Sequence, residues 1–269
     1  MRVDLHIHTT ASDGTYTPGE VIELALQEGL SAIAITDHDT LSGAKEGLII
    51  GQEIGFEVIP GVELSTDFNG TDVHILGYLI RDFDRIEQVL NQIQQLRLTR
   101  AERMVRKLKQ LGVKIEMDDV LEEAKGDSVG RPHIAAAMVK KGVVSSVREA
   151  FELYIGDDKP AYIPKPKLTP LQAVELIISS GGVPVLAHPG LTNRDDLIPK
   201  LVEGGLKGIE VYYPEHTEGQ TRRYLSIAHR YDLIPTGGSD FHGEIKPWIK
   251  IGCVTVGYDV VEEMKGLVT

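Results

Sequence analysis

VDLHIHTTASDG (residues 3–14) opens the chain, and AIAITDHDT (residues 32–40) repeats its pattern. In each stretch a short apolar run ends in histidine and aspartate, which is typical of a buried strand that runs into a metal site. Imidazole and carboxylate groups are ligands for divalent zinc, manganese and iron. His6 and His8 are two residues apart, so on a strand both project from one face and can bind one cation.

Apolar runs alternate with helical patterns along much of the chain. The expected strands are 3–8, 31–36, 56–64, 73–80, 182–187, 205–213, 233–238 and 251–257. The expected helices between them are 18–29, 41–54, 170–180, 194–203 and 216–230. Strands separated by helices of this length indicate βαβ units and a parallel sheet. The pattern therefore predicts an α/β fold, with seven or so such strands in a shortened or distorted β/α barrel.

Residues 82–166 interrupt this alternation and read as helices only. Apolar residues recur there at three- and four-residue spacing, as in Ile86, Val89, Leu90, Ile93, Leu96, Met104, Val105, Leu108 and Leu111. Further helices are expected near 117–125, 132–141 and 147–155. We therefore expect a barrel formed by residues 1–81 and 167–269, with a helical subdomain of residues 82–166 inserted over its active face.

Composition narrows the class of protein. The net charge of the 269 residues is −12, which is opposite in sign to a surface that binds duplex DNA. The apolar runs are far shorter than the ~20 residues that span a bilayer, and the first residues do not resemble a signal peptide. The single cysteine, Cys253, is expected as a small core residue of the last strand. Together these features favour a cytoplasmic protein without a disulfide.

Six of the nine histidines lie in or directly after an expected strand: His6, His8, His38, His74, His188 and His242. The carboxylates of Asp13, Glu63 and Asp240 lie in the same places. In parallel α/β barrels the active site forms where the carboxyl ends of the strands meet. A single histidine such as His6 or His8 could equally be an ordinary buried core residue. Histidines placed by chance, however, would not concentrate at strand ends. We therefore expect the set to converge on one rim.

The motifs DLHIHTTASDG, ITDHDT, GVELST, VHILGY, LAHPG and GSDFH, spread over residues 4–242, resemble the successive motifs of the PHP (polymerase and histidinol phosphatase) family. The resemblance implies a distorted seven-stranded β/α barrel with up to three divalent ions of manganese, zinc or iron. It implies a first metal held by His6, His8, Glu63 and Asp240. It implies a second metal held by Glu63, His74 and His188, and a third held by Asp13, His38 and His242.

Charge balance in such a centre favours a phosphate substrate. Three divalent cations and three carboxylates leave about three positive charges, which attract anions although the protein is acidic overall. The expected nucleophile is a metal-bridging hydroxide held via Glu63, His188 and Asp240. No general acid can be named from the sequence.

The stretch SVGRPHIAAAM (residues 128–138) suggests the substrate class. Pro132 suits a first helical turn, so Arg131 and His133 lie at a helix N-terminus, which attracts anions. Taken alone, the stretch also fits an ordinary capped helix. GRPHIA in a helical insertion resembles the subgroup of 3′,5′-nucleoside bisphosphate phosphatases and 5′–3′ exoribonucleases. The resemblance implies hydrolysis of nucleotide esters such as adenosine 3′,5′-bisphosphate, or of short 5′-phosphorylated RNA, with Arg131 and His133 facing the substrate.

Other candidate contacts have weaker signals. Lys165 and Lys167 lie where the chain re-enters the barrel and are phosphate-binding candidates, with solvated loop lysines as the alternative. His216 follows a strand end and is a candidate for contact with a base or a phosphate. The basic residues of the long insertion helix are expected on a solvated face rather than along an RNA backbone: Arg97, Arg100, Arg103, Arg106, Lys107 and Lys109. Asp4, and one of Asp37 and Asp39, are expected to orient ligand imidazoles.

Three other functions remain open. A histidinol-phosphate phosphatase, or another hydrolase of small phosphomonoesters, would use the same metal cluster, although GRPHIA favours nucleotides. A metal-dependent amidohydrolase commonly needs a bridging lysine at a strand end, and no lysine occupies such a position here. A non-catalytic metal-binding module would be expected to lack some ligands. Phosphate release from adenosine 3′,5′-bisphosphate, measured in parallel with release from histidinol phosphate, would distinguish a nucleotide phosphoesterase from a histidinol-phosphate phosphatase.

Overall fold

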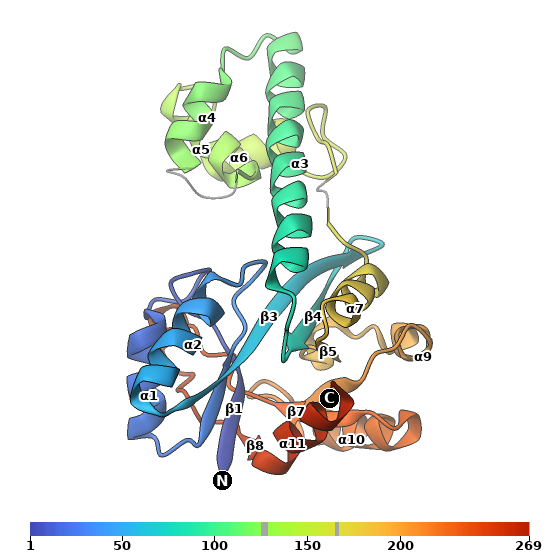
Figure 1. The fold of residues 1–269 in the computed structure, drawn as a ribbon. Helices are drawn as coiled ribbons and strands as arrows, with labels where there is room; N and C mark the ends of the chain where they lie inside the picture. Colours follow the sequence, from blue (N-terminus) through green and yellow to red (C-terminus); the bar gives the residue numbers. More distant parts are fainter. Residues whose placement is uncertain (125–128, 165–166, 269) are drawn as a thin grey trace. The chain divides into compact units, whose positions relative to one another are not determined.

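The computed structural model describes residues 1–124, 129–164 and 167–268. It divides into two compact units (Figure 1), which are described separately below. We call Met1–Glu87 with Leu168–Thr269 the barrel unit, and Gln88–Lys167 the helical unit. Among the described residues, no helix combines the length and the apolar character needed to cross a bilayer.

One sheet forms the frame of the barrel unit. Its strands are β1 (Arg2–Ile7), β2 (Ala32–Ile35), β3 (Glu57–Phe68), β4 (Thr71–Tyr78), β5 (Val183–Leu186), β6 (Gly208–Tyr212), β7 (Ile234–Gly237) and β8 (Val256–Gly257). Their order in the sheet is β7-β6-β5-β4-β3-β2-β1-β8. The backbone N–H of Asp240, just after β7, donates to His6 O of β1 at 2.8 Å, and that of His8 donates to Phe241 O at 2.9 Å. These bonds bring the segment after β7 against β1, the strand next to the edge strand β8, and so nearly close the barrel, which confirms the predicted α/β class.

Helices follow most strands of the barrel unit. They are α1 (Pro18–Gln27), α2 (Ser42–Ile54), α7 (Pro170–Ser179), α8 (Pro189–Thr192), α9 (Ile198–Glu203), α10 (Glu218–Tyr231) and α11 (Tyr258–Leu267). Short 3₁₀ turns lie at Asp195–Leu197 and Gly243–Ile245. Thr17, Thr169 and Thr217 begin α1, α7 and α10 with capping boxes, in which each hydroxyl accepts from the third helical residue and that side chain binds back. The expected helices are thus present, within a few residues at their ends.

The β3–β4 connection differs from the expected parallel arrangement. The two strands pair antiparallel from Gly61–Tyr78 to Phe68–Thr71, and only Asn69 and Gly70 connect them. Both linking residues have positive φ, 52° and 82°. Asn-Gly is the favoured pair for a two-residue hairpin, and such a loop is too short for a parallel crossover. Asn69-Gly70 is therefore a sequence signal for an antiparallel hairpin, which the expected parallel sheet did not take into account.

The last expected strand is also shorter than predicted. Only Val256–Gly257 of residues 251–257 forms a strand, β8, which pairs antiparallel with β1. The preceding residues form turns, so Cys253 is exposed rather than a core residue, and that prediction was wrong. The β-branched run VTV favours a strand, but strand formation also depends on a partner, and here β1 pairs with Val256 and Gly257 only.

Two apolar layers position the site. One cluster contains Leu5, Ala34, Leu76 and Val185 from the strands together with Met264 of α11. The other packs β1, β2 and β3 against α1 and α2. Every residue of β1 after Arg2 is buried, which is typical of a strand covered on both faces. His6 therefore lies in a strand fixed from both sides.

The helical unit has its own core. It contains the later part of α3 (Phe83–Gln110), followed by α4 (Met117–Ala124), α5 (Arg131–Lys140), α6 (Val147–Ala150) and a π-helical turn at Phe151–Ile155. Met104, Leu108, Val120 and Met138 are fully buried in one cluster. Helices were expected in all of these places. The division between units falls inside α3, a few residues after the predicted boundary at residue 82.

Candidate metal centre

The end of β1 brings two buried imidazoles together. His6 Nε2 lies 3.1 Å from His8 Nε2. Each of these atoms lies 3.2 or 3.3 Å from Glu63 Oε2, on β3, and from Asp240 Oδ1, after β7. His6, His8 and Glu63 are almost completely buried, and Asp240 is 6% exposed. Four donor atoms from three separate segments thus converge in the barrel interior.

The spacing of these atoms fits a divalent cation. With metal–ligand bonds of ~2.1 Å, neighbouring ligands of one ion lie about 3.0–3.4 Å apart. Glu63 Oε2 is buried and accepts no hydrogen bond, although three imidazole nitrogens lie within 3.3 Å of it. Its neighbours therefore point toward a shared space rather than toward the oxygen. A buried carboxylate oxygen without a hydrogen bond is costly unless a cation neutralises it.

Glu63 is also the centre of a second group. Its other oxygen, Oε1, lies 2.9 Å from His74 Nδ1 on β4 and 2.9 Å from His188 Nε2 after β5. His38 Nδ1 lies 3.1 Å from Oε2. The compact group of donor atoms here is His38, Glu63 and His74. The residues predicted to hold the second metal were Glu63, His74 and His188, without His38. In the structure the imidazoles of both His38 and His188 lie against the Glu63 carboxylate.

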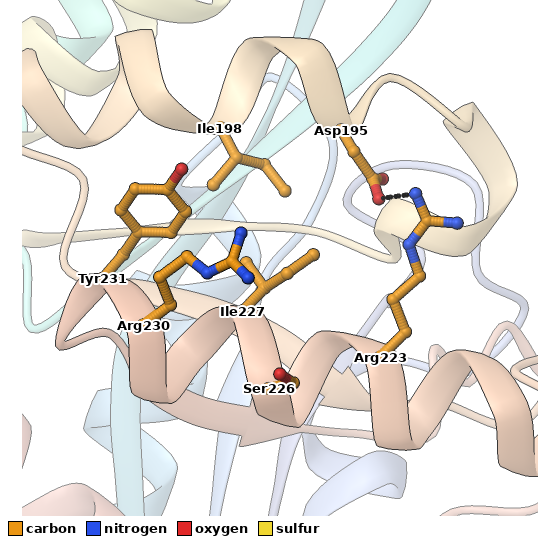
Figure 2. Close-up of a pocket in the computed structure, with 7 residues that line it drawn as sticks. All are labelled: Asp195, Ile198, Arg223, Ser226, Ile227, Arg230 and Tyr231. Atoms are coloured by element: carbon orange, nitrogen blue, oxygen red, sulfur yellow. Dashed lines mark ion pairs between the residues drawn. The ribbon is translucent and has the colours of Figure 1, made fainter.

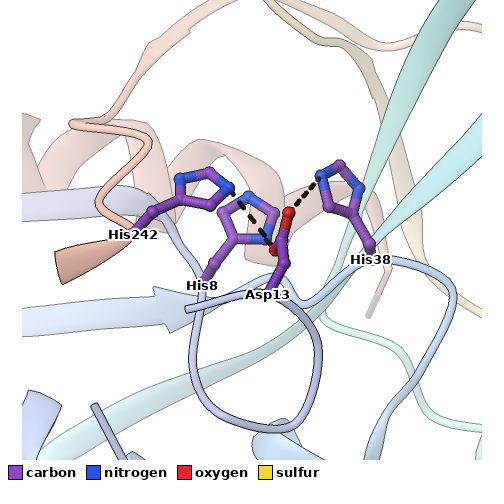
Figure 3. A group of neighbouring side chains, drawn as sticks. All are labelled: His8, Asp13, His38 and His242. Carbon is purple, nitrogen blue, oxygen red and sulfur yellow. Dashed lines mark ion pairs between the residues drawn. The ribbon is translucent and has the colours of Figure 1, made fainter. Parts of the chain in front are cut away.

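A third group gathers around Asp13, in the loop after β1. Figure 3 shows His8, His38 and His242 turned toward its carboxylate. His242 Nε2 lies 3.4 Å from Asp13 Oδ1, and His38 Nε2 lies 3.9 Å from Oδ2. Partial burial raises the pKa of Asp13, but the contact with His242 and the charges of His38 and His8 outweigh this effect and hold its pKa below its usual range. All nine predicted ligands therefore lie in one continuous cluster.

Two of these residues have unusual backbone conformations. Asp240 has φ 54° and His188 has φ 23°, values that side chains other than glycine rarely adopt. The Asp240 N–H is held by His6 O, and the His188 N–H donates to Glu210 Oε2 at 2.8 Å. Such strain persists where surrounding contacts fix it, and it concentrates at functional sites.

Glu210 of β6 is a site residue that sequence reasoning missed. It is fully buried, and its Oε1 lies 2.9 Å from His6 Nδ1. A carboxylate on Nδ1 fixes the Nδ1–H tautomer and directs the Nε2 lone pair toward the candidate metal position. The signal was a single glutamate inside the apolar strand GIEVYY.

Asp240 has two partners that were also missed. Tyr213 Oη donates to Asp240 Oδ2 at 2.9 Å, and Lys246 Nζ donates to the same oxygen at 2.7 Å. Burial, followed by the charge of Asp240, raises the pKa of Tyr213, so the phenol stays protonated. These bonds leave Oδ1 facing His6 and His8.

The aspartates expected to orient imidazoles accept hydrogen bonds from backbone N–H groups and from hydroxyls. Asp4 accepts from the N–H groups of Ser239 and Gly252, at 2.9 and 2.8 Å. Asp37 accepts from the Thr9 N–H at 2.7 Å and from Ser12 Oγ at 2.7 Å, which fixes the loop that carries Asp13. Asp39 Oδ1 accepts from Ser65 N–H at 2.9 Å. Asp4 therefore does not orient an imidazole through these contacts, and the orienting contact on His6 comes from Glu210. The prediction that one of Asp37 and Asp39 orients an imidazole stays a prediction.

The predicted substrate residues Arg131 and His133 lie in the helical unit. The Arg131 guanidinium lies 5.4 Å from the ring centroids of both Phe151 and Tyr162, and its Nη1 donates to Asp157 at 2.9 Å. His133 Nδ1 accepts from Gly130 N–H at 3.1 Å and so caps the start of α5. Lys165, the third predicted contact in this region, lies outside the described residues.

The basic face of α3 is not uniformly solvated. Arg103, Arg106 and Lys109 are exposed, as expected. Arg100 is only 7% exposed, and its Nε donates to Ile163 O at 2.6 Å. Burial and the charge of Arg131 lower the pKa of Arg100. The charge of Asp157, which pairs with Arg131, acts in the opposite direction and offsets part of this effect.

His216 is occupied by backbone contacts. Its Nε2 accepts from Gly190 N–H at 3.1 Å, and its Nδ1 donates to Val211 O at 2.9 Å. Burial lowers its pKa and favours the neutral ring. Both nitrogens are therefore used to join β6 to α8, and the predicted contact with a base or a phosphate has no free nitrogen to make it.

A separate cavity of about 370 Å³ lies between α10 and the segment that leads into α9 (Figure 2). Ile198, Ile227 and Tyr231 form its apolar part, and Arg223 pairs with Asp195 at its side. None of the candidate metal ligands lines it. This cavity is therefore separate from the candidate metal centre.

Comparison with known proteins agrees with these features. The model of the PHP domain family matches residues 4–154. A 5′-3′ exoribonuclease of Haemophilus influenzae is 34% identical over 260 residues, which cover 93% of each chain. A phosphoribosyl 1,2-cyclic phosphate 1,2-diphosphodiesterase of Eggerthella lenta is 34% identical over 91% of this chain and 95% of its own. A 3′,5′-nucleoside bisphosphate phosphatase of Chromobacterium violaceum is 32% identical over 89% and 87%.

Solved structures show the same fold over nearly the whole chain. A protein of Bifidobacterium adolescentis named as a metal-dependent phosphoesterase superposes with a TM-score of 0.74 and 35% identity, covering 99% of this chain and 96% of its own. An amidohydrolase of Chromobacterium violaceum, solved with bound sulfate, superposes with a TM-score of 0.71 and 29% identity over the same shares.

Proposed function

The chain belongs to the PHP family and, from that premise, we propose that it is a metal-dependent phosphoesterase that hydrolyses phosphate esters of nucleotides. The observation that carries the proposal is the 3.1–3.3 Å spacing of donor atoms from His6, His8, Glu63 and Asp240. Such a buried set suits a divalent cation and has no comparable use in a metal-free protein. The relatives' names add that similar chains cleave phosphate esters.

We propose three divalent ions of manganese, zinc or iron as the cofactors. Glu63 would be shared by the first two, and the groups around it overlap in the way that shared ligands require. His8 and His38 each belong to two groups, so the third ion would lie close to the others. When bound, such ions supply an activated water molecule and neutralise charge on the phosphoryl oxygens.

The chain's own residues prepare the donor atoms. Glu210 accepts from His6 Nδ1 and leaves Nε2 free to bind. Tyr213 and Lys246 hold Asp240 Oδ2 and leave Oδ1 facing inward. Burial excludes water from the interior set, which strengthens electrostatic interactions with a bound ion. Asp13, which is more exposed, is the ligand most accessible to a substrate phosphate.

For the substrate phosphate we propose a second cationic site in the helical unit. Arg131 is held between two aromatic rings, so little side-chain entropy is lost when it binds an anion. Asp157 balances part of the positive charge of Arg100 and Arg131, and a bound phosphate would balance the rest. Together with His133 and Lys165, these arginines are the proposed contacts that select phosphorylated nucleotides. Their number and charge suit a 5′-phosphorylated end as well as a bisphosphate.

We also propose that the protein works in the cytoplasm and does not bind duplex DNA. The single cysteine suits a reducing compartment. The net charge of −12 opposes long-range attraction to duplex DNA, so a nucleic acid would have to bind through local cations.

The test is a phosphate-release assay after reconstitution with manganese or zinc. Adenosine 3′,5′-bisphosphate and a short 5′-phosphorylated oligoribonucleotide are the expected substrates. Histidinol phosphate and a ribose 1,2-cyclic phosphate serve as competing candidates. Turnover of histidinol phosphate alone would replace the nucleotide proposal, and no release from any ester would favour a binding module.

Variants of two candidate ligands, with a control at a third position, complete the test. His38→Ala and Asp240→Ala should each lower turnover at least ~100-fold, since they remove donor atoms from the clusters. His229→Ala, an exposed histidine on α10, is the control and should retain wild-type turnover. Full activity of His38→Ala and Asp240→Ala would contradict the metal assignment.

A further inference from the structure

Trp248 is an exposed aromatic residue that the proposed chemistry does not use. It is the only tryptophan in the chain and is 72% exposed. Among the exposed large apolar side chains of the described residues, only the first residue, Met1, is more exposed. Ile245, three residues earlier, is 56% exposed. An indole left in water at a fixed position is typical of a binding surface.

The loop that carries Trp248 starts at the metal centre and is held along its length. It follows His242, and the Glu244 N–H donates to Thr15 Oγ1 at 2.9 Å. The Ile249 N–H donates to Lys246 O at 2.9 Å, which closes a four-residue turn with Pro247 in its second position. Proline in that position pre-sets the turn. Trp248 is therefore presented from a fixed backbone rather than from a flexible tail.

The same turn is attached to a candidate metal ligand. Lys246, its first residue, donates from Nζ to Asp240 Oδ2 at 2.7 Å. The Cα atoms of Lys246 and Trp248 are two peptide units apart, so they are separated by at most about 7.6 Å. The side chain of Lys246 spans the distance from the turn to Asp240. The turn that carries Trp248 is therefore attached directly to a candidate metal ligand.

We propose that Trp248 is the platform on which the base of the nucleotide substrate stacks, with Ile245 as the neighbouring apolar contact. The inference rests on the proposed function and names the part of the site that recognises the base. Aromatic side chains stack on any base, since every base has a π-face, and adjacent cations hold the backbone. Lys250, two residues after the indole in the stretch KPWIK, is exposed and adds a positive charge beside it, which favours a phosphorylated ligand over an apolar protein partner.

Intrinsic fluorescence tests the contact directly, because Trp248 is the only tryptophan. Adenosine 5′-monophosphate should quench the emission of the metal-loaded protein in a saturable manner. Ribose 5-phosphate, which has the phosphate and the sugar but no base, should compete for binding without comparable quenching. Equal quenching by both compounds, or none by a nucleotide that inhibits turnover, would overturn the proposal.

Kinetics provide the second readout. Trp248→Ala should raise KM for a nucleotide substrate by about 5- to 150-fold relative to KM for a phosphate ester without a base. Trp248→Phe keeps an aromatic ring and should recover most of the loss. Ile49→Ala, which truncates an exposed apolar side chain on α2, is the matched control and should change neither constant.

The two levels of the proposal fail in different ways. If the wild-type protein releases no phosphate from any nucleotide, the proposed function fails. If it does hydrolyse nucleotides and Trp248→Ala leaves the ratio of the two KM values unchanged, only the role of Trp248 fails. Circular dichroism of the variants checks their folding, and the exposure of Trp248 predicts that they fold normally.

Discussion

At the scale of single residues, Glu210 connects two candidate ligands. Its Oε1 holds His6 Nδ1 and its Oε2 holds the backbone N–H of His188. We predict that Glu210→Gln lowers the affinity for manganese or zinc by about 10- to 100-fold, because an amide cannot accept at both atoms. Calorimetric titration with metal measures the loss. Glu215→Gln, an exposed glutamate in the loop after the same strand, is the control, and equal affinities would refute the role of Glu210.

The pKa of His8 gives a pH prediction at the same scale. Burial opposes the charged imidazolium, but interactions with Asp240 and Glu63 outweigh it and raise the pKa of His8 to about 9. Burial opposes the charged form of His6 too, but the charges of Glu210, Glu63 and Asp240 outweigh it and raise the pKa of His6. The two Nε2 atoms lie 3.1 Å apart, so the space between them holds only one proton. A cation must displace that proton before it can bind. Apparent metal affinity should therefore rise about tenfold per pH unit below pH 9.

His38 provides the contrast. Burial lowers the pKa of His38 to about 4, so this imidazole is already neutral at pH 7 and releases no proton. Binding of the first metal ion should thus release about one proton, which comes from the His6–His8 pair. Titration calorimetry in buffers with different ionisation enthalpies measures this number. An affinity that does not change between pH 6 and pH 8 would contradict this proton displacement.

At the scale of elements, Gly238 allows the segment after β7 to approach β1. A Cβ atom at Gly238 would lie 2.5 Å from His6 Cβ and in conflict with the His6 backbone. We predict that Gly238→Ala lowers the free energy of unfolding by about 1–3 kcal/mol and weakens metal binding, because it separates Asp240 from His6. Chemical denaturation and metal titration measure the two effects. Gly266→Ala on α11 meets no atom within 4 Å and is the control, so comparable losses in both variants would argue against this packing role.

The elements also show how far the sequence determines the site. Ligand types and strand-end positions identified His6, His8, Glu63 and Asp240, because metal binding requires those side chains at those places. Glu210 and Tyr213 escaped notice because they belong to an apolar strand, where only the partner across the barrel reveals their role. The β3–β4 hairpin was missed because a parallel sheet was expected throughout, although Asn69-Gly70 specifies a tight turn. Local signals thus predicted the candidate ligands that the structure brings together, and long-range contacts were needed for the residues that orient them.

At the scale of the whole molecule, the two units differ in what stabilises them. The helical unit relies on an apolar core that contains Leu108 and Met138. The barrel unit has in addition a cluster of buried carboxylates and imidazoles. Bound cations would neutralise the carboxylates, and without them Glu63 Oε2 remains buried and unpaired. The stability of the barrel unit should therefore depend on metal, whereas that of the helical unit should not.

Metal removal tests this difference. Chelation should destabilise the barrel unit by about 3 kcal/mol relative to protein at a free metal concentration near 100 times Kd, as expected for linkage between binding and folding. In calorimetry, Met138→Ala should identify the signal of the helical unit, since truncating this buried side chain costs about 2–5 kcal/mol there. Chelator should shift the other signal, and the shift should be the same in wild type and in Met138→Ala. A chelator-induced loss confined to the Met138-dependent signal would show that the metal ions stabilise the helical unit instead.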